Sequence, residues 1–191
     1  MENVRQNPVF QRYVQELLKW NKSVNLIGRK SEEEIWDVHI EDSLGLHPYL
    51  KDYPLDVVID IGSGGGLPAI PLAILNPHIH FIMTDVVKKK TGFMEWAVSL
   101  LKLNAEVIDI SQGFNYTGPC LITSRAFSEL SNILDWQKRH APAACDFLLL
   151  KGTEETTLKE LENTTIKKYN LIPRDRGSVF HRTIKYQLPL F

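Results

Sequence analysis

A glycine-rich turn directly after a short apolar segment constrains the fold of this chain more than any other feature. Residues 57–61 (Val-Val-Ile-Asp-Ile) have the composition of a buried strand. Four of the five residues 62–66 are glycine, and the apolar residues 67–74, with proline near their start, predict a helix. A strand, a glycine turn and a helix in this order form the corner at which a doubly wound α/β sheet binds a nucleotide or nucleoside. Glycine is needed there because a Cβ would hold the ligand away from the backbone.

Two acids indicate which ligand this corner binds. Asp85 follows a second predicted strand, residues 79–84, at the spacing where an acid binds the hydroxyls of a ribose. Asp60 lies just before the glycine turn, which lacks the G-x-G-x-x-G spacing that accommodates a pyrophosphate. S-adenosylmethionine has no phosphate, but it carries an ammonium group that an acid at a strand tip complements. The sequence therefore favours S-adenosylmethionine over NAD or FAD, and over a glycine turn without a ligand.

The remaining periodicities predict helices followed by an alternation of strands and helices. Apolar residues at helical spacing predict a first helix that ends near Asn21. The capping box Ser31–Glu34 predicts a second helix whose apolar face includes Ile35 and Val38. Further expected elements are a helix at 88–102, strands at 107–110, 121–123 and 147–150, and a closing antiparallel pair at 167–172 and 179–188. This order predicts an α/β, Rossmann-like fold with a mainly parallel sheet and right-handed crossovers.

Length and composition favour one domain of 191 residues, with a helical extension at 1–54 and a Rossmann-like body at 55–191. No apolar run has membrane-spanning length, and the first residues do not resemble a secretory signal. Cys120 and Cys145 lie in apolar segments without metal-ligand spacing, so we expect reduced core thiols of a cytoplasmic protein and no metal site. Because the net charge is only −1, any nucleic-acid binding must come from a local patch.

Several short motifs add to this reading of the fold. The segments Trp20–Leu26 and Val38–Leu44 precede the glycine loop Asp60–Pro68. Further motifs are Asp85 with Lys89-Lys90 and Phe93-Met94, then Thr123–Phe127, Leu150–Gly152 and His181-Arg182. In combination these segments resemble the bacterial small-subunit (16S) ribosomal RNA guanine-N7 methyltransferases, a family also called glucose-inhibited division protein B. The resemblance covers nearly the whole chain.

The resemblance implies an enzyme that uses S-adenosyl-L-methionine to methylate N7 of a guanine in a loop of small-subunit ribosomal RNA. It implies a class I methyltransferase fold, a substrate that is either the RNA or the assembled small ribosomal subunit, and no contact with a membrane. We expect a monomer in the cytoplasm. The residues matching the cofactor site are Gly62, Ser63, Gly64, Gly66, Leu67, Asp85, Ser111, Gln112 and Arg125. The residues expected at the catalytic site are Asn25, His39, Arg125, Lys151 and Arg182.

Three places depart from the family's pattern. Ala69 stands where the family has glycine, and Cys120 stands where it has an acid. The pair that holds the adenine, which resembles Ala-Glu in the family, is Ser111-Gln112 in this chain. This difference costs little cofactor affinity if backbone groups hold the adenine.

The expected site residues also have ordinary structural interpretations. Arg125 can form a structural ion pair instead of contacting cofactor or RNA, and Lys151 can be a solvated strand end instead of a substrate contact. His39 and Asp42, three residues apart, can stabilise a helix or form a wall of the active site. Asn25 can cap or turn the chain instead of reading a base edge.

The substrate atom determines which mechanism the sequence must support. Guanine N7 carries a lone pair and no proton, so its methylation needs alignment and exclusion of water, but no general base. Two alternatives remain open: a small-molecule methyltransferase with the same cofactor, and a catalytically silent RNA-binding or cofactor-sensing module. A face that carries both the cofactor and basic residues such as Lys89, Lys90 and Arg174 would disfavour the first. Lys88–Lys90 start a predicted helix, where their charge is unfavourable, and either face solvent or contact phosphate.

Overall fold

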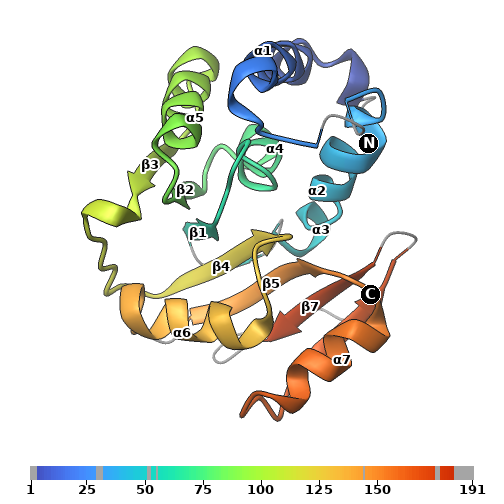
Figure 1. Ribbon diagram of the computed structural model, residues 1–191, viewed down its shortest axis with the longest axis vertical. Helices are drawn as coiled ribbons and strands as arrows, with labels where there is room; N and C mark the ends of the chain where they lie inside the picture. The colour runs from blue at the N-terminus through green and yellow to red at the C-terminus, as the bar shows by residue number, and fades with distance from the viewer. Residues whose placement is uncertain are drawn as a thin grey trace.

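One mixed β-sheet organises the protein. The computed structural model describes residues 4–28, 32–50, 53–54, 56–143, 145–174 and 177–182, with only the backbone of 181–182. Within them the strands form one seven-stranded sheet in the order β3-β2-β1-β4-β5-β7-β6 (Figure 1). The strands are β1 Val57–Ile61, β2 His80–Asp85, β3 Ala105–Asp109, β4 Cys120–Arg125, β5 Cys145–Lys151, β6 Asn170–Pro173 and β7 Ser178–Arg182. Strands β1 to β5 are parallel, and β7 is antiparallel to β5 and β6. The predicted parallel sheet with a closing antiparallel pair is confirmed.

The expected strands are present with shifted ends. β4 continues two residues beyond its expected end at Thr123, because its added residues still pair with β5. Ile110, predicted to end the third strand, instead begins the 3-10 helix η4 (Ile110–Gln112). The antiparallel pair begins at Asn170, three residues later than predicted at its start, and the expected strand residues 183–188 lie outside the described residues.

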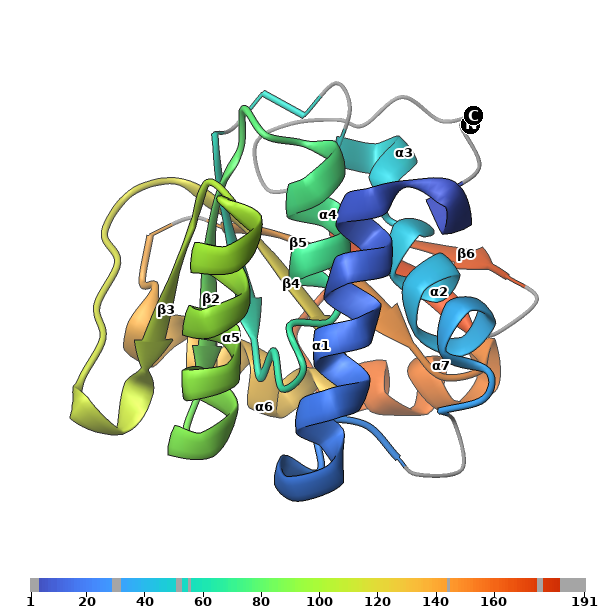
Figure 2. The same cartoon turned by 90° about the horizontal axis from the view of Figure 1, so that it is seen from above.

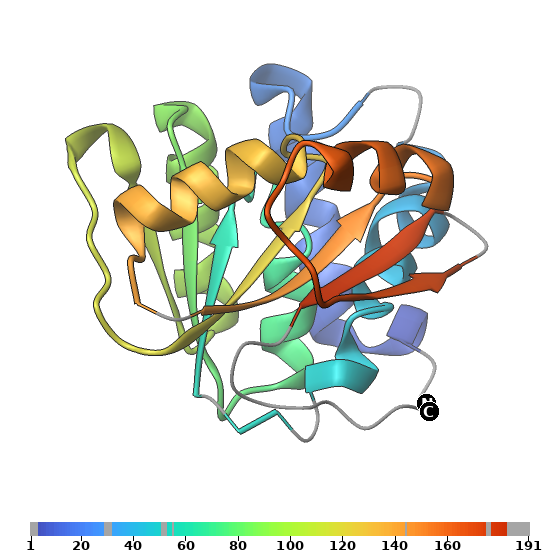
Figure 3. The same cartoon turned by 90° about the horizontal axis from the view of Figure 1, so that it is seen from below.

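Helices cover both faces of this sheet. The helices of the first face are α1 Pro8–Val24, α4 Ala69–Leu75 and α5 Lys88–Leu101, with the short segments of the N-terminal extension beside them (Figure 2). The helices of the second face are α6 Leu130–His140 and α7 Glu154–Glu162 (Figure 3). Neighbouring strand residues therefore enter different cores: Val58 packs with α1 and α5 residues, and Ile59 packs with α6 residues. Strands buried on both faces need apolar side chains at every position, as residues 57–61 nearly have.

Helix α1 follows the 3-10 turn η1 (Val4–Gln6) and is longer than predicted. Asn7 caps its start by accepting a hydrogen bond from the Val9 amide, and Pro8 occupies the first turn. It ends at Val24, not near Asn21, because Asn25 adopts a left-handed conformation with φ of 54°. Asn21 is buried within the helix, and its side-chain oxygen accepts a hydrogen bond from the Ile27 amide. This bond returns the chain toward the sheet.

The second predicted helix is not one continuous α-helix. The described chain forms a π-helix, η3 (Ile35–Glu41), followed by two short helices, α2 (Asp42–Leu44) and α3 (His47–Leu50). The predicted cap Ser31 lies outside the described residues. Ile35 is buried as predicted, whereas Val38 is half-buried. A π-turn widens the helix, and such turns are often found at functional sites.

The core also contains the two cysteines. Cys120 and Cys145 are directly paired residues of β4 and β5, and both are buried free thiols with their sulfur atoms 2.7 Å apart. Among the described residues, no helix is both long and apolar enough to cross a membrane.

Candidate active site

The glycine turn lies at the topological switch point of the sheet, where the strand order reverses. β1 pairs with β2 on one side and with β4 on the other, so the loops after β1 and β4 leave the same edge in opposite directions. Gly62, Gly64 and Gly66 all have positive φ angles. A Cβ at Gly62 would overlap the ring of Phe127, whereas a Cβ at Gly64 would meet nothing closer than backbone atoms at 3.8 Å. The turn is therefore packed less tightly at Gly64, which is half-buried, than at Gly62.

The helical extension and β2 hold this turn in place. The Tyr13 hydroxyl of α1 donates a hydrogen bond of 2.6 Å to the Gly65 carbonyl. The Ser63 amide donates to the Thr84 carbonyl at 3.0 Å, and the Leu67 amide donates to the Ser63 carbonyl at 2.9 Å. Because these contacts are buried, the turn is preorganised before any ligand binds.

Asp60 is a buried acid beneath the turn. It is fully buried at the end of β1, and its Oδ1 accepts a 2.8 Å hydrogen bond from the Thr123 hydroxyl. Its Oδ2 is also buried and has no hydrogen-bond partner among the described residues. Burial is the main reason that the pKa of this carboxyl is raised to about 7. A buried hydrogen-bond acceptor without a donor destabilises the folded protein unless a ligand supplies the donor. An ammonium group beside the turn would supply one.

Asp85 ends β2 and faces the same turn. It is buried, and its two oxygens accept hydrogen bonds from the Gly64 amide at 3.0 Å and the Val87 amide at 2.9 Å. The next residues, Val86 and Val87, are apolar yet 61% and 41% exposed. An exposed apolar pair beside an acid provides a surface for the flat ring of a nucleoside. Sequence analysis missed the two valines, although their position directly after Asp85 was a signal.

Ser111 and Gln112 lie at the same edge, because Asp109 at the end of β3 pairs with Asp85. The Ser111 hydroxyl and amide donate to Asp109, as does the Gln112 side chain, and the hydrogen bonds from Ser111 lower the pKa of Asp109. The Ser-Gln pair is thus held by the strand that precedes it.

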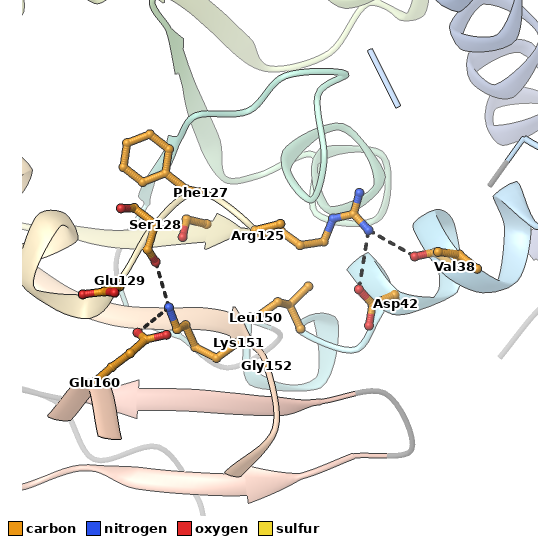
Figure 4. A pocket seen from close by; sticks show the side chains of 12 residues that line it. Val38, Asp42, Arg125, Phe127, Ser128, Glu129, Leu150, Lys151, Gly152 and Glu160 are labelled. Carbon is orange, nitrogen blue, oxygen red and sulfur yellow. Dashed lines mark hydrogen bonds and ion pairs between the residues drawn. The ribbon is translucent and has the colours of Figure 1, made fainter. Parts of the chain in front are cut away.

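A cleft of about 590 Å³ opens beside the glycine turn, after β4 and β5. Its lining residues are Val38, Asp42, Ser124, Arg125, Ala126, Phe127, Ser128, Glu129, Leu150, Lys151, Gly152 and Glu160. Figure 4 shows Arg125 reaching toward Asp42 and Val38, and Lys151 reaching toward Glu160. Phe127 is 40% exposed and follows Ala126, which has a left-handed φ of 52°. Sequence analysis recognised the motif that contains Phe127 but gave the ring no role.

Arg125 joins the end of β4 to the π-helix. It donates to the Val38 carbonyl at 3.1 Å and to Nδ1 of His39 at 2.8 Å, and it lies 3.6 Å from Asp42. Arg174 also bonds Asp42, at 3.1 Å. His39 is buried, and burial, then the nearby Arg125 charge, lowers its pKa to about 4. The imidazole is therefore neutral at pH 7, as an acceptor for Arg125 must be.

Lys151 is not a solvated strand end, and its charge is paired within the chain. Its side chain is 7% exposed and bonds Glu160 at 2.7 Å and the Ser128 carbonyl at 2.8 Å. Glu160 also accepts from the Leu130 amide at 2.9 Å. Sequence analysis missed Glu160, because no sequence spacing relates a strand end to a residue in the last turn of the following helix.

The other expected residues are placed less centrally. Asn25 is exposed in the loop that contacts the glycine turn through Leu26. Arg182 pairs with Phe147, four residues along β5 from Lys151, so its backbone lies about 13 Å from the cleft edge and its predicted catalytic role gains no support. Lys88–Lys90 start α5 after Val86 and Val87, at the edge that carries the glycine turn. The described residues contain no group of three or more side chains that could hold a metal ion.

The doubly wound sheet, the preorganised glycine turn and the two acids define a class I S-adenosylmethionine-dependent methyltransferase. A solved structure from Methanococcus maripaludis assigned to this class has the same fold, with a TM-score of 0.61 at 15% identity over 84% of this chain and 94% of that one. The sequence model of the GidB family, rRNA small subunit methyltransferase G, matches residues 6–173. The chain belongs to this family. It is similar to ribosomal RNA small subunit methyltransferase G from Vibrio cholerae (36% identity, 86% of this chain and 81% of that one) and from Helicobacter pylori (38%, 78% and 83%).

Proposed function

We propose that the protein transfers a methyl group from S-adenosylmethionine to N7 of a guanine in small-subunit ribosomal RNA. The single observation that supports this most is the buried, unpartnered Oδ2 of Asp60 beneath a glycine turn, next to an open cleft. The family membership supports the RNA substrate and the guanine position.

The cofactor would supply an electrophilic methyl group on its sulfonium. Asp60 would accept a hydrogen bond from the ammonium group, and Asp85 would accept from the ribose hydroxyls while retaining its bonds to the loop amides. The remaining groups that we assign to the cofactor are Gly62, Ser63, Gly64, Gly66, Leu67, Ser111, Gln112 and Arg125. Ser111 and Gln112 would form the wall beside the adenine, held in place because the Ser111 amide and the side chains of both residues bond Asp109.

The chain's residues act by positioning and not by proton transfer. Guanine N7 has no proton to lose, so the reaction requires no base. His39 would be a poor base, because its pKa is lowered to about 4 and its Nδ1 already accepts from Arg125. Arg125 holds the π-helix against the cleft through Val38 and His39. Lys151, Asn25 and Arg182 would contact the RNA. Alignment of nucleophile, methyl and sulfur, with water excluded when the RNA covers the cleft, would supply the rate enhancement.

The substrate would be the ribosomal RNA or the assembled small subunit, and we propose a cytoplasmic monomer. Mapping N7-methylguanosine in small-subunit RNA from cells with and without the gene tests the function, together with methylation by the purified protein in vitro. Loss of one modified guanine in the deletion strain and its restoration by the protein is the expected result. Unchanged modification, or methylation of a small molecule only, would refute the proposal.

A further inference from the structure

Methylation at guanine N7 restricts how guanine can be recognised, if the proposed function holds. Proteins commonly read guanine with an arginine that donates to both O6 and N7. Here N7 must keep its lone pair for the methyl group, so a donor at N7 would block the reaction. Recognition must therefore use the faces of the base and its Watson–Crick edge, which presents O6 as an acceptor beside the donors N1–H and N2–H₂.

The cleft contains a donor and an acceptor side by side. Lys151 Nζ has three hydrogens, and it uses two of them on Glu160 and the Ser128 carbonyl. Glu160 uses Oε2 for both Lys151 and the Leu130 amide. Among the described residues, Oε1 of Glu160 makes no hydrogen bond. A third lysine hydrogen and a carboxylate oxygen are thus both available in one cleft.

The same cleft also offers an aromatic surface. The Phe127 ring packs against Gly62 of the cofactor turn and is 40% exposed. Phe127 lines the same cleft as Lys151 and Glu160, so a base bound in this cleft would meet the ring as well as the ion pair. Stacking of a base on an aromatic side chain is a common feature of single-stranded RNA recognition.

We propose that the Lys151–Glu160 ion pair selects guanine by its Watson–Crick edge, with Phe127 as the stacking platform. Lys151 donates to O6, and Oε1 of Glu160 accepts from N1–H and N2–H₂. Adenine presents the reverse pattern, an amino group toward the lysine and an unprotonated N1 toward the carboxylate, and is rejected. Because the pairing edge is occupied by the protein, the target guanosine must be unpaired in the bound RNA.

Inosine at the target position tests this assignment, because inosine lacks only the N2 amino group. The wild-type protein should methylate the inosine RNA with a kcat/KM about 10- to 100-fold lower than the guanosine RNA. Glu160→Gln keeps an acceptor for the Leu130 amide but removes the charge. It should lower kcat/KM on guanosine RNA by a similar factor and abolish most of the discrimination against inosine, with unchanged binding of S-adenosylmethionine.

Glu155→Gln is the matched control, because Glu155 lies on the same helix in an exposed ion pair with Lys159. It should behave as wild type. Phe127→Leu should reduce methylation of guanosine and inosine RNA equally. If Glu160→Gln retains the wild-type preference for guanosine over inosine, the proposed recognition is wrong and Glu160 is structural. If the wild-type protein methylates no guanine N7 in ribosomal RNA, the proposed function fails first, and this inference fails with it.

Discussion

Asp60 shows how burial prepares a single residue for a ligand. Its pKa of about 7 is well above its ordinary value of 3.8, mainly because burial disfavours the charged form. Between these pH values the native state holds a proton that the unfolded state has lost. The contribution of Asp60 to the stability of the ligand-free protein should therefore fall as the pH rises from 4 to 7, and a comparison with Asp60→Asn isolates this contribution.

The first prediction is that cofactor binding releases a proton from Asp60. An ammonium group beside the carboxylate lowers its pKa, so affinity for S-adenosylmethionine should rise with pH up to about 7, by at most about tenfold per pH unit. Calorimetry at pH 6.5 in buffers of different ionisation enthalpy measures the released proton. Asp60→Asn should bind more weakly and release none. Equal wild-type affinity at pH 6 and pH 8 would contradict the role of Asp60.

The second prediction concerns His39, whose pKa is lowered to about 4. Because no group in the proposed reaction must lose a proton, single-turnover rates at saturating substrates should be independent of pH from 6 to 8. His39→Gln retains a hydrogen-bond acceptor for Arg125 and should give the same flat profile with a modest loss of rate. A rising limb that disappears in His39→Gln would show that His39 moves a proton.

The depressed pKa of His39 also has a consequence for stability. The unfolded chain takes up a proton below about pH 6.5, whereas the native imidazole stays neutral to about pH 4. The contribution of His39 to native stability should therefore fall as the pH drops through this window, opposite in sign to that of Asp60, and His39→Gln should lack it. Thermal denaturation at pH 7 and pH 5 measures the difference.

The location of a single residue could be predicted from the sequence where the residue directly follows a predicted strand. Asp60, Asp85 and the glycines follow strands directly, so their edge of the sheet was predictable. Glu160 and Phe127 gain their roles from contacts across the fold, with Lys151 and Gly62, that no spacing encodes. The missing partner of Asp60 Oδ2 likewise becomes visible only when its surroundings are known.

At the scale of elements, Asp42 connects three parts of the chain. It begins α2, and it accepts from Arg174 next to β6 while lying 3.6 Å from Arg125 at the end of β4. Its side chain is only 14% exposed. The wall of the cleft formed by the π-helix is thus attached to the sheet through the Asp42 carboxylate as well as through the bonds from Arg125 to Val38 and His39.

The third prediction is that Asp42→Ala destabilises the protein by on the order of 2 kcal/mol, because it leaves two poorly solvated guanidinium groups without this partner. Chemical denaturation measures the change. The adjacent Glu41 is a matched control, since it pairs with Arg5 in an exposed salt bridge. Glu41→Ala should change stability much less. Equal effects of the two substitutions would show that the ion pairs of Asp42 contribute no more to stability than an exposed salt bridge does.

Element types were predictable, whereas some element ends and one geometry were not. Apolar periodicity gave the existence of α1 and α5, but Asn25 and not Asn21 ends α1, because Asn21 is bonded inside the fold. The π-helix η3 has no local sequence signal, since it depends on contacts of Val38 and His39 with Arg125, 87 and 86 residues away.

At the scale of the whole molecule, a net charge of −1 cannot attract RNA as a uniform field. Lysines 88–90 stand at the start of α5, on the edge with the glycine turn, although lysine is unfavourable at a helix N-terminus. An unfavourable placement at this edge supports a role in contacting phosphates and disfavours a small-molecule substrate.

The fourth prediction concerns the slope of log K for RNA binding against the logarithm of the salt concentration. In the double variant Lys89→Gln/Lys90→Gln this slope should be smaller in magnitude by about 1 to 2, because each neutralised phosphate contributes about 0.7 to 0.9 to it. Affinity for S-adenosylmethionine should not change. Lys138→Gln is the control, because Lys138 lies in the last turn of α6, which leads to the start of β5 and not to the strand ends that carry the glycine turn. It should keep the wild-type slope. An unchanged slope in the double variant would place the RNA on another surface.

The dependence of α1 on the sheet has a consequence for biosynthesis. The apolar stripe of α1 packs against α5 and α4, in one core with residues of β1, β2 and β4, and a ribosome makes α1 before all of these elements. At about 5 to 20 residues per second, the roughly 100 residues from α1 to the end of β4 take about 5 to 20 s to synthesise. During that interval a nascent helix carries Phe10, Tyr13 and Leu17 without the surface that buries them. Nascent chains of this protein should therefore be bound by chaperones at α1, and released once β4 has left the exit tunnel.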